Sequence, residues 1–543
     1  MEICEQNHSQ PDQFPSIDHL RTFCINRSRL SLVISAVHAA IDKGQNVLAV
    51  ANLAYRQDRL PDGSELLAST QSSVATRDLD LQTTARSILF QYFSPTEGIE
   101  DYRHQPPELT VTQLNLAIGR QDIPQIEGLA VQLLLFLSTP SSRVKCELVG
   151  SLGGCEIVHN ALRVCNEHQA RLAVLLLLQC IRGLCSCGDS FETCVVMNVD
   201  EFRTAQLEAL IAMVLRTSED AEILAAACGV VPYLTRVSEK QLHADSAEMC
   251  ETLVSVLQQQ MTVVSVVKTA CRAITSLVAN TNDARTYLAV ADACEALVHV
   301  LDVHRPAVDV VEEACCAISV LVRCDGNDIR LGEVGACEAL VQVLEQHMSV
   351  ISVVEKVCST IRNLAWVDDN QGRLASAAAC EIVVRALQQH MSVVSVVEEA
   401  CCAIRNLAWL DGNKSRLASA GACTAVVRAL KHHMAVGSSV VEACCAIRNL
   451  AAKNHDNQVQ LVRLGACDAI IRGLELHMFS DDVARVACGA IANLSTQIDS
   501  PGELGRTLQL LVRCYTFYQL PGIINTISIL SMQEATCNLI LKA

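Results

Sequence analysis

The sequence lacks an excess of positive charge. Its 543 residues include 42 Lys and Arg against 59 Asp and Glu, which gives a formal net charge of -17 at pH 7. Proteins that hold nucleic acid through its phosphates depend on clustered Lys and Arg side chains. The charge balance therefore argues against a nucleic-acid partner.

Long hydrophobic runs are also missing. The most apolar stretch, LAVLLLLQCI at residues 172–181, lies between Arg171 and Arg182. It is about half of the ~20 residues that a membrane-spanning helix needs. The opening segment MEICEQNHSQPDQ is polar and acidic, whereas a secretory signal has a basic flank and an apolar core. We expect a soluble protein without a membrane span, located in the cytoplasm or alternatively in the nucleus.

Catalytic signatures are absent as well. The sequence contains no HExxH, G-x-S-x-G or protein-kinase motif. One nucleophilic alternative is the thiol of Cys402 or Cys445, which helical periodicity places on an exposed face. Since the sequence places no base to activate either thiol, we expect no enzymatic activity, no catalytic residue and no cofactor.

A recurring histidine invites a metal-site interpretation. Equivalent residues on successive layers of a helical repeat are about 10 Å apart, the usual helix-packing distance. A bond from zinc to a histidine nitrogen is only ~2 Å long. We therefore expect no metal site and interpret these histidines as surface or capping residues. They are His304, His347, His390, His433 and His477.

Cysteine, by contrast, is abundant, with 28 residues. Disulfide frameworks are typical of short secreted chains, whereas these cysteines stand inside apolar helical patterns. We expect reduced thiols that pack as small hydrophobic side chains.

The chain is built on an internal repeat. The phrase ACCAIRNLAW at 400–409 returns as ACCAIRNLAA at 443–452 and is preceded by VCSTIRNLAW at 357–366. A second marker, the cysteine of segments such as ACEALV, recurs every 43 or 44 residues. Its positions are Cys250, Cys294, Cys337, Cys380, Cys423 and Cys467. A sustained period near 43 is typical of an α-helical solenoid.

Each repeat is predicted to contain three helices. An asparagine in a turn is suited to cap the short first helix through its side-chain oxygen, and a glycine eight residues later ends that helix. The second helix has one apolar stripe at positions i, i+3, i+4 and i+7, for instance Cys423, Val426, Val427 and Leu430. The turn asparagines are Asn327, Asn370, Asn413 and Asn457, and the glycines are Gly335, Gly421 and Gly465, with Ala378 as the exception.

The third helix carries the repeated phrase. At about 100° per residue, its apolar residues fall on one side and are expected to face the neighbouring repeats. In one repeat these are Val397, Ala400, Ile404, Leu407 and Ala408. The opposite arc of the same helix consists of Glu398, Glu399, Cys402, Arg405, Asn406 and Trp409. Because the residues of this arc also recur, they are predicted to line one surface.

The turn asparagine, the segment GACTAVVRAL and the asparagine within AIRNLA resemble the armadillo repeat, the three-helix unit of beta-catenin and importin alpha. The resemblance covers roughly residues 240–500 strongly and the preceding residues weakly. It implies an all-α, right-handed armadillo-type solenoid of about eight three-helix repeats, whose third helices line a concave groove. It also implies that one asparagine per third helix binds the backbone of an extended partner peptide. Those positions are Asn363, Asn406, Asn449 and Asn493.

The chemistry of asparagine fits this role, because a primary amide offers both donors and an acceptor to a peptide group. The alternative is that each asparagine only terminates its helix. At the corresponding positions the earlier repeats carry Gly183, Tyr233, Ser276 and Val320. We therefore expect the main groove between about residues 355 and 500.

Charged and aromatic residues accompany the asparagines. Arg362, Arg405 and Arg448 form one row, and Glu313, Glu399 and Glu442, interrupted by Lys356, form another. A groove of mixed charge would suit a partner that carries both signs; alternatively, the row of glutamates is a solvated helix face. Trp366 and Trp409 stand three residues after an asparagine. One interpretation is that Trp409 stacks on the guanidinium of Arg405 or on a ligand side chain. The alternative is that it packs beneath the following turn.

The pattern predicts three regions: an irregular helical N-terminal region at 1–125, a repeat array at 126–500 and a C-terminal helical cap at 501–543. AVANLAY at 49–55 is a candidate degenerate repeat. The predicted function is a non-enzymatic scaffold or adaptor that binds an extended segment of a partner protein. The alternative is an armadillo-like regulator or exchange factor that grips a folded chaperone or small GTPase. The sequence gives no prediction of oligomeric state.

Overall fold

The computed structural model of the chain describes residues 107–137, 142–185, 193–235, 245–280, 282–323 and 326–497. Within these ranges the chain forms α-helices and the short 3-10 helix η3 (Ser495–Gln497), with no strand. The predicted all-α fold class is therefore confirmed. The candidate repeat at 49–55 and the predicted C-terminal cap at 501–543 lie outside the described residues.

The chain divides into two compact units, residues 1–210 and 211–543. In the first unit the described helices are α6 (Pro107–Arg120), α7 (Ile123–Leu137), α8 (Ser142–Ser151), α9 (Gly154–Glu167), α10 (Arg171–Cys185) and α11 (Thr193–Thr204). α10 packs against α7 and α9, and residues 173–181 of its apolar run are buried. The run is thus the core of a helical stack. No helix in the described ranges is both long and apolar enough to cross a bilayer.

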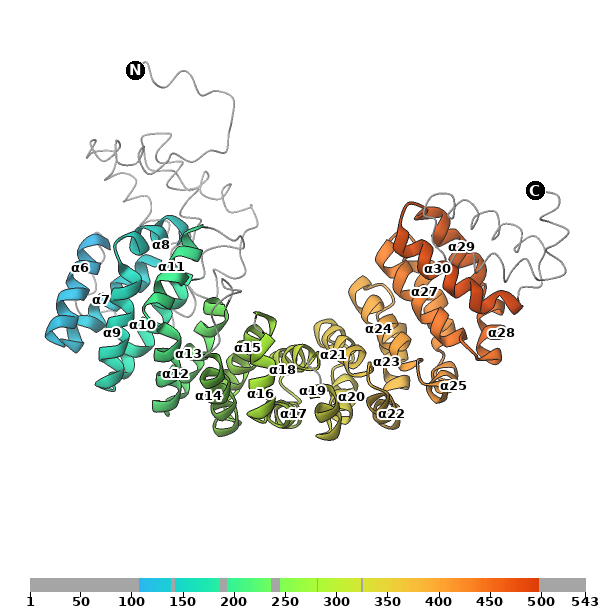
Figure 1. The fold of residues 1–543 in the computed structure, drawn as a ribbon, viewed down its shortest axis with the longest axis horizontal. Coiled ribbons are helices and arrows are strands. Elements are labelled where there is room, and N and C mark those ends of the chain that lie inside the picture. Colours follow the sequence, from blue (N-terminus) through green and yellow to red (C-terminus); the bar gives the residue numbers. More distant parts are fainter. Residues whose placement is uncertain are drawn as a thin grey trace, which may run out of the picture. The chain divides into compact units, whose positions relative to one another are not determined.

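The second unit follows the predicted period. After α12 (Leu207–Thr217), which contains the boundary, its described third helices are α13 (Ala221–Leu234), α15 (Val264–Asn280), α18 (Val308–Leu321), α21 (Ile351–Leu364), α24 (Val394–Leu407), α27 (Gly437–Ala451) and α30 (Asp481–Leu494). Each packs on the next in chain order (Figure 1). The second helices are α14 (Asp245–Gln259), α17 (Ala293–Val303), α20 (Ala336–Gln346), α23 (Ala379–Gln389), α26 (Ala422–His432) and α29 (Ala466–Leu476). The short first helices are α16 (Asn282–Val290), α19 (Asn327–Glu333), α22 (Asp368–Ser376), α25 (Asp411–Ser419) and α28 (His455–Arg463).

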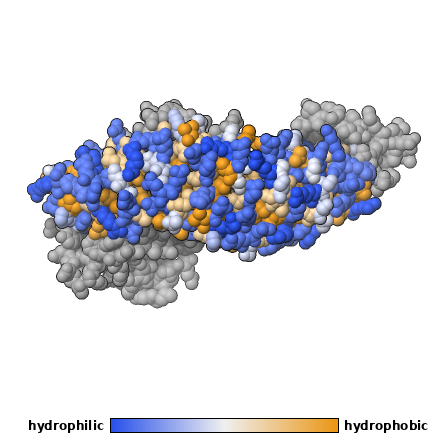
Figure 2. Space-filling model, turned by 90° about the horizontal axis from the view of Figure 1, so that it is seen from below, coloured by the Kyte–Doolittle hydropathy of each residue, from blue (hydrophilic) through white to orange (hydrophobic). Residues whose placement is uncertain are grey.

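The predicted stripes form the core between the layers. Cys423, Val426 and Leu430 on α26 are all fully buried. On α24, the apolar residues Val397, Ala400 and Ile404 are buried as expected. Outside this core, hydrophilic residues cover most of the face drawn in Figure 2, with hydrophobic residues interspersed. Burial of one stripe per helix, repeated in every layer, is what stabilises the stack.

The residue between the first and second helices needs left-handed backbone geometry. Gly335, Gly421 and Gly465 have φ of 94°, 92° and 75°, and Ala378 has φ of 70° at the same place. Glycine adopts this conformation freely, whereas a Cβ makes it unfavourable. The predicted helix ends are confirmed, and Ala378 is the strained member of the series.

The prediction that the turn asparagines cap the first helices is wrong. Asn370 and Asn413 lie inside α22 and α25, whose N-cap residues are Val367 and Leu410. The amide of Asn413 instead donates from Nδ2 to the main-chain oxygens of Leu407, at 3.1 Å, and Gln371, at 3.3 Å. The last carbonyls of a helix have no partner within that helix. Since the first helix starts earlier than expected, its asparagine reaches the carbonyl that ends the preceding third helix. Asn327, Asn370 and Asn457 likewise donate to main-chain oxygens.

The recurring histidines tie successive repeats together. Each one is the C-cap residue of a second helix. Its Nε2 lies 2.5 to 2.8 Å from a main-chain oxygen 42 or 43 residues earlier, as in His433 Nε2 to Met391 O at 2.6 Å. A carbonyl oxygen can only accept, so Nε2 is the donor. The capping interpretation is confirmed, but the surface interpretation is wrong, because His304, His347, His390 and His433 are buried.

Candidate partner-binding surface

The four predicted asparagines lie in one row on α21, α24, α27 and α30. We call this row the asparagine ladder, and the side of these four helices that carries it the third-helix face. Each amide donates from Nδ2 to a main-chain oxygen of the preceding third helix. The bonds are Asn363 to Ser319 at 3.2 Å, Asn406 to Arg362 at 2.8 Å, Asn449 to Arg405 at 2.8 Å and Asn493 to Arg448 at 2.8 Å. One amide hydrogen of every ladder residue therefore links neighbouring repeats.

The amide oxygens of the ladder divide into two kinds. Oδ1 of Asn363 accepts from Arg362 Nε at 3.3 Å, and Oδ1 of Asn406 accepts from Arg405 Nε at 3.1 Å. Within the described part of the chain, Oδ1 of Asn449 and of Asn493 accepts no hydrogen bond. The C-terminal half of the ladder thus keeps its acceptors available, while the N-terminal half uses them internally.

The predicted rows of arginine and glutamate pair with each other across repeats. Arg362 on α21 lies 2.8 Å from Glu399 on α24, and Arg405 on α24 lies 2.6 Å from Glu442 on α27. All four side chains are less than one quarter exposed. Burial raises the pKa of Glu399, and the Arg362 charge opposes that shift. The primary role of these charged side chains is therefore to link neighbouring repeats.

Arg448 is the exception in its row. The position on α30 that corresponds to Glu399 and Glu442 holds Val486, which is buried. Arg448 forms no ion pair within the described residues, and its Cδ lies 3.0 Å from where a Cβ on Gly489 would be. Among the described residues, one guanidinium on the third-helix face therefore has no counter-charge.

Both tryptophans are exposed. Trp366 and Trp409 stand two residues after the ends of α21 and α24, and the two residues are 72% and 69% exposed. Packing of Trp409 beneath the following turn is therefore wrong. Stacking on Arg405 is not observed either, because that guanidinium lies at Glu442 and Asn406. The two indole rings are apolar surface that this chain leaves open.

The thiols proposed as alternative nucleophiles are not on the surface. Cys402 and Cys445 are 4% and 6% exposed. Packed third helices enclose both side chains, and burial raises the pKa of both thiols. The helical wheel placed them on the exposed arc, but the neighbouring third helix covers that part of the arc. A buried thiol with a raised pKa is a poor nucleophile.

Comparison with known proteins gives matches in structure alone. No protein-family model matches the sequence, and no curated protein matches it. An engineered protein solved by a structural genomics consortium matches with a TM-score of 0.65 and 19% identity, over 79% of this chain and 98% of its own. A structure that concerns a phosphorylation switch in the interaction between cadherin and beta-catenin matches with a TM-score of 0.60 and 16% identity, over 89% of this chain and 92% of that one. A designed armadillo repeat protein in complex with the peptide (KR)4 matches 45% of this chain and 99% of its own, with 25% identity and a TM-score of 0.40.

The chain has the armadillo-type fold. At these identities the likeness extends to the arrangement of helices, and the surface chemistry is this chain's own.

The earlier armadillo-type repeats carry no ladder. At the ladder position of α15 stands Ser276, whose Oγ lies 2.6 Å from Thr235 Oγ and 3.4 Å from the main-chain oxygen of Pro232. A hydroxyl here makes the same kind of link between repeats as the ladder amides. A link between repeats at this position therefore does not require an amide.

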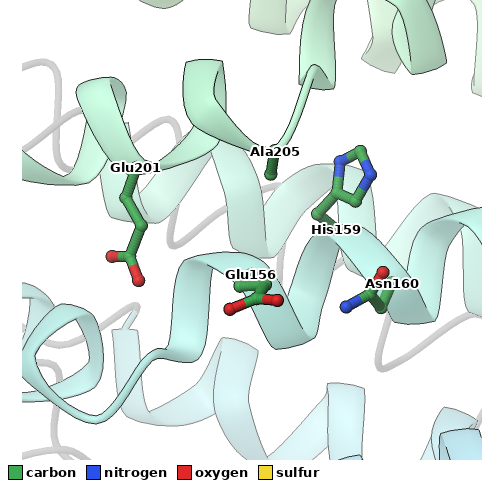
Figure 3. A pocket seen from close by; sticks show the side chains of 5 residues that line it. All are labelled: Glu156, His159, Asn160, Glu201 and Ala205. Atoms are coloured by element: carbon green, nitrogen blue, oxygen red, sulfur yellow. The ribbon is translucent and has the colours of Figure 1, made fainter.

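The first unit of this armadillo-type chain contains a pocket that sequence reasoning missed. It is about 260 Å³ in volume and is lined by Glu156, His159 and Asn160 of α9 together with Glu201 and Ala205 (Figure 3). His159 is 9% exposed and its Nδ1 has no hydrogen-bond partner. Burial lowers the pKa of His159 and raises that of Glu201. No sequence signal pointed here, because these residues fall where the repeat phrase is weakest.

Proposed function

We propose that this protein is a non-enzymatic, protein-binding scaffold that holds an extended segment of a partner across the third-helix face, between about residues 355 and 500. The observation that carries the proposal is the state of Asn449 and Asn493. Each amide is fixed by one Nδ2 hydrogen bond of 2.8 Å, and its second N–H and its Oδ1 form no hydrogen bond with the described residues. A fixed amide with both functions free is suited to bind the N–H and C=O of a peptide group.

The spacing of the ladder supports an extended occupant. Packed helices lie about 8 to 10 Å apart, and an extended chain advances about 3.3 Å per residue. Successive ladder residues would therefore meet every second or third residue of the segment. Contacts to the backbone would give affinity, and neighbouring side chains would give specificity, as in other modes of peptide recognition.

The exposed tryptophans add apolar contact area beside the ladder. Large aromatic side chains are enriched among the residues that dominate binding energy. Trp366 and Trp409 each follow a ladder helix and are about 70% exposed. We propose that they pack on apolar side chains of the bound segment.

The test uses a displayed library of random peptides and then the affinity of an enriched peptide for single-alanine variants. Asn449→Ala and Asn493→Ala are expected to weaken binding about tenfold, the equivalent of one good hydrogen bond to a peptide. Asn363→Ala is the matched control, since it removes the same kind of link between repeats, but its Oδ1 is already bonded to Arg362. Ser276→Ala should leave binding unchanged.

Equal losses for Asn363→Ala and Asn449→Ala, at equal helicity by circular dichroism, would show that the ladder acts through stability alone. Hydrogen exchange measured with the partner bound distinguishes an extended segment from the alternative, a folded partner protein. An extended segment should protect α21, α24, α27 and α30, whereas a folded client should also protect the first and second helices.

A further inference from the structure

Arginine and glutamate side chains on successive third helices of the second unit pair with each other in several places. An arginine on one third helix meets a glutamate on the next in Arg272 with Glu313, Arg362 with Glu399 and Arg405 with Glu442. Between α18 and α21 the glutamate position holds Lys356, and no such pair forms among the described residues. Arg448 is the next arginine of the row after Arg405, and the corresponding position on α30 holds Val486. Among the described residues the row of Arg362, Arg405 and Arg448 therefore ends in one positive charge without an ion-pair partner, on a protein whose net charge is -17.

Two acids on α27 and α30 already have ion-pair partners. Glu442 pairs with Arg405 at 2.6 Å, and Asp482 pairs with Arg485 at 2.7 Å. Neither is free to neutralise Arg448 without leaving another arginine unpaired.

The side chain of Arg448 is held against α30. Its main-chain oxygen accepts from Asn493 Nδ2 at 2.8 Å, and its stem lies across α30 at Gly489, with Cδ 3.0 Å and Nη1 3.8 Å from the place of a Cβ there. Asn449 follows it directly in the chain, and its Oδ1 accepts no hydrogen bond from the described residues. The free guanidinium therefore belongs to the same part of the surface as the two ladder amides that remain available.

We propose that Arg448 binds a carboxylate side chain of the partner, so that the third-helix face selects an extended segment with Asp or Glu at the residue that reaches α30. This inference rests on the proposed function. The partner's carboxylate takes, over α30, the place that Glu399 takes over α24 and Glu442 takes over α27. A guanidinium matches a carboxylate with two parallel N–H donors. Within the chain, the two oxygens of Glu399 lie 3.1 and 2.8 Å from one guanidinium nitrogen, Arg362 Nη1.

The experiment selects a displayed random-peptide library on the full chain and on three variants, each checked for native helicity and thermal unfolding. The wild type is expected to enrich Asp or Glu at one fixed position. Arg448→Ala should lose that enrichment, and Arg448→Glu should replace it with Lys or Arg. For one enriched peptide, changing the acid to its amide should weaken binding roughly tenfold or more. The control Arg362→Ala removes a guanidinium that is already paired and should leave the enrichment in place.

A second experiment tests the missing acid opposite Arg448 without changing Arg448 itself. Val486→Glu supplies the missing acid within the chain and should abolish the acidic preference while peptides still bind. If peptides bind and Asn449→Ala weakens them but Arg448→Glu selects the same sequences as the wild type, this inference falls and the proposed function stands. If no peptide is enriched at all, both fall. A phosphoserine peptide that binds far more tightly than its glutamate counterpart would overturn the assignment to a carboxylate.

Discussion

Asn449 donates a hydrogen bond of 2.8 Å from Nδ2 to the main-chain oxygen of Arg405, 44 residues earlier in the chain. The same relationship joins Asn406 to Arg362 and Asn493 to Arg448. A residue that we propose for partner recognition is therefore also a structural link between repeats. The two roles are compatible because a primary amide has two N–H groups and one oxygen, and the link uses a single N–H.

The hydrogen bond from a ladder asparagine to the preceding third helix should contribute to the free energy of unfolding. Asn406→Ala leaves the main-chain oxygen of Arg362 without its donor, and we expect the free energy of unfolding to fall by about 1 to 2 kcal/mol. Urea denaturation followed by circular dichroism measures this change. Ser376→Ala on the exposed surface of α22 is the control, with an expected change within about 0.5 kcal/mol. A loss as small as the control's would mean that water replaces the link.

The adjacent residues His432 and His433 provide a matched pair. His433 is buried and its Nε2 lies 2.6 Å from Met391 O, whereas His432 is exposed. His433→Ala should cost about 1 to 3 kcal/mol through the unsatisfied buried carbonyl, and His432→Ala should cost less than about 0.5 kcal/mol. Thermal unfolding of both variants tests this difference. Similar midpoints would argue against a structural role for the histidine row.

Replacing Ala378 with glycine should stabilise the folded protein. It has φ of 70°, and glycine at this place removes an unfavourable left-handed Cβ, offset by the greater freedom of glycine in the unfolded chain. We expect Ala378→Gly to raise the free energy of unfolding by up to about 1 kcal/mol. The reverse change, Gly335→Ala, should lower it by a similar amount, since an added Cβ there meets no atom closer than 3.9 Å and only the backbone is strained. The two changes moving stability in the same direction would refute this account.

Thiol reactivity should follow burial. Burial raises the pKa of Cys423 to about 11 and that of Cys380 to about 12, and both side chains are fully buried. Cys316 is half-buried. Alkylation of the native protein at pH 7.5, mapped peptide by peptide, should modify Cys316 well before Cys402 or Cys445. Rapid selective labelling of Cys402 would instead reopen the possibility of a reactive thiol.

His159 should make the first unit sensitive to mild acid. Burial lowers the pKa of His159 in the folded protein below its ordinary value of about 6.5. Below that pH the unfolded state binds more protons than the folded state, so stability falls as the pH drops from about 7 toward 5 and is unaffected above that window. His159→Gln should flatten this part of the profile of thermal midpoint against pH. His168→Gln, which changes an exposed histidine just after the same helix, should leave the profile as it is, and identical slopes for all three proteins would refute the assignment.

The sequence by itself determined the period, the three helices of each repeat and the core. A hydrophobic stripe such as that of Cys423, Val426 and Leu430 reports burial directly, because the spacing of residues on one helix decides which of them share a face. The left-handed turn at Gly421 was equally readable, since its geometry selects glycine. The recurrence of Asn363, Asn406, Asn449 and Asn493 every 43 or 44 residues was readable too, and the resemblance to the armadillo repeat singled the row out.

Contacts between repeats were decided only by the tertiary structure. A helical wheel shows which arc leaves the core, but not how far the next helix covers that arc, and for this reason it placed the buried Cys402 and Cys445 on the surface. It also could not show that the amide of Asn413 donates to main-chain oxygens and does not cap its helix. Nor could it show that the guanidinium of Arg405 is paired, whereas that of Arg448 has no ion-pair partner among the described residues. These distinctions depend on partners about 40 residues away in the chain, which only the stacking of one repeat on the next brings within hydrogen-bonding distance.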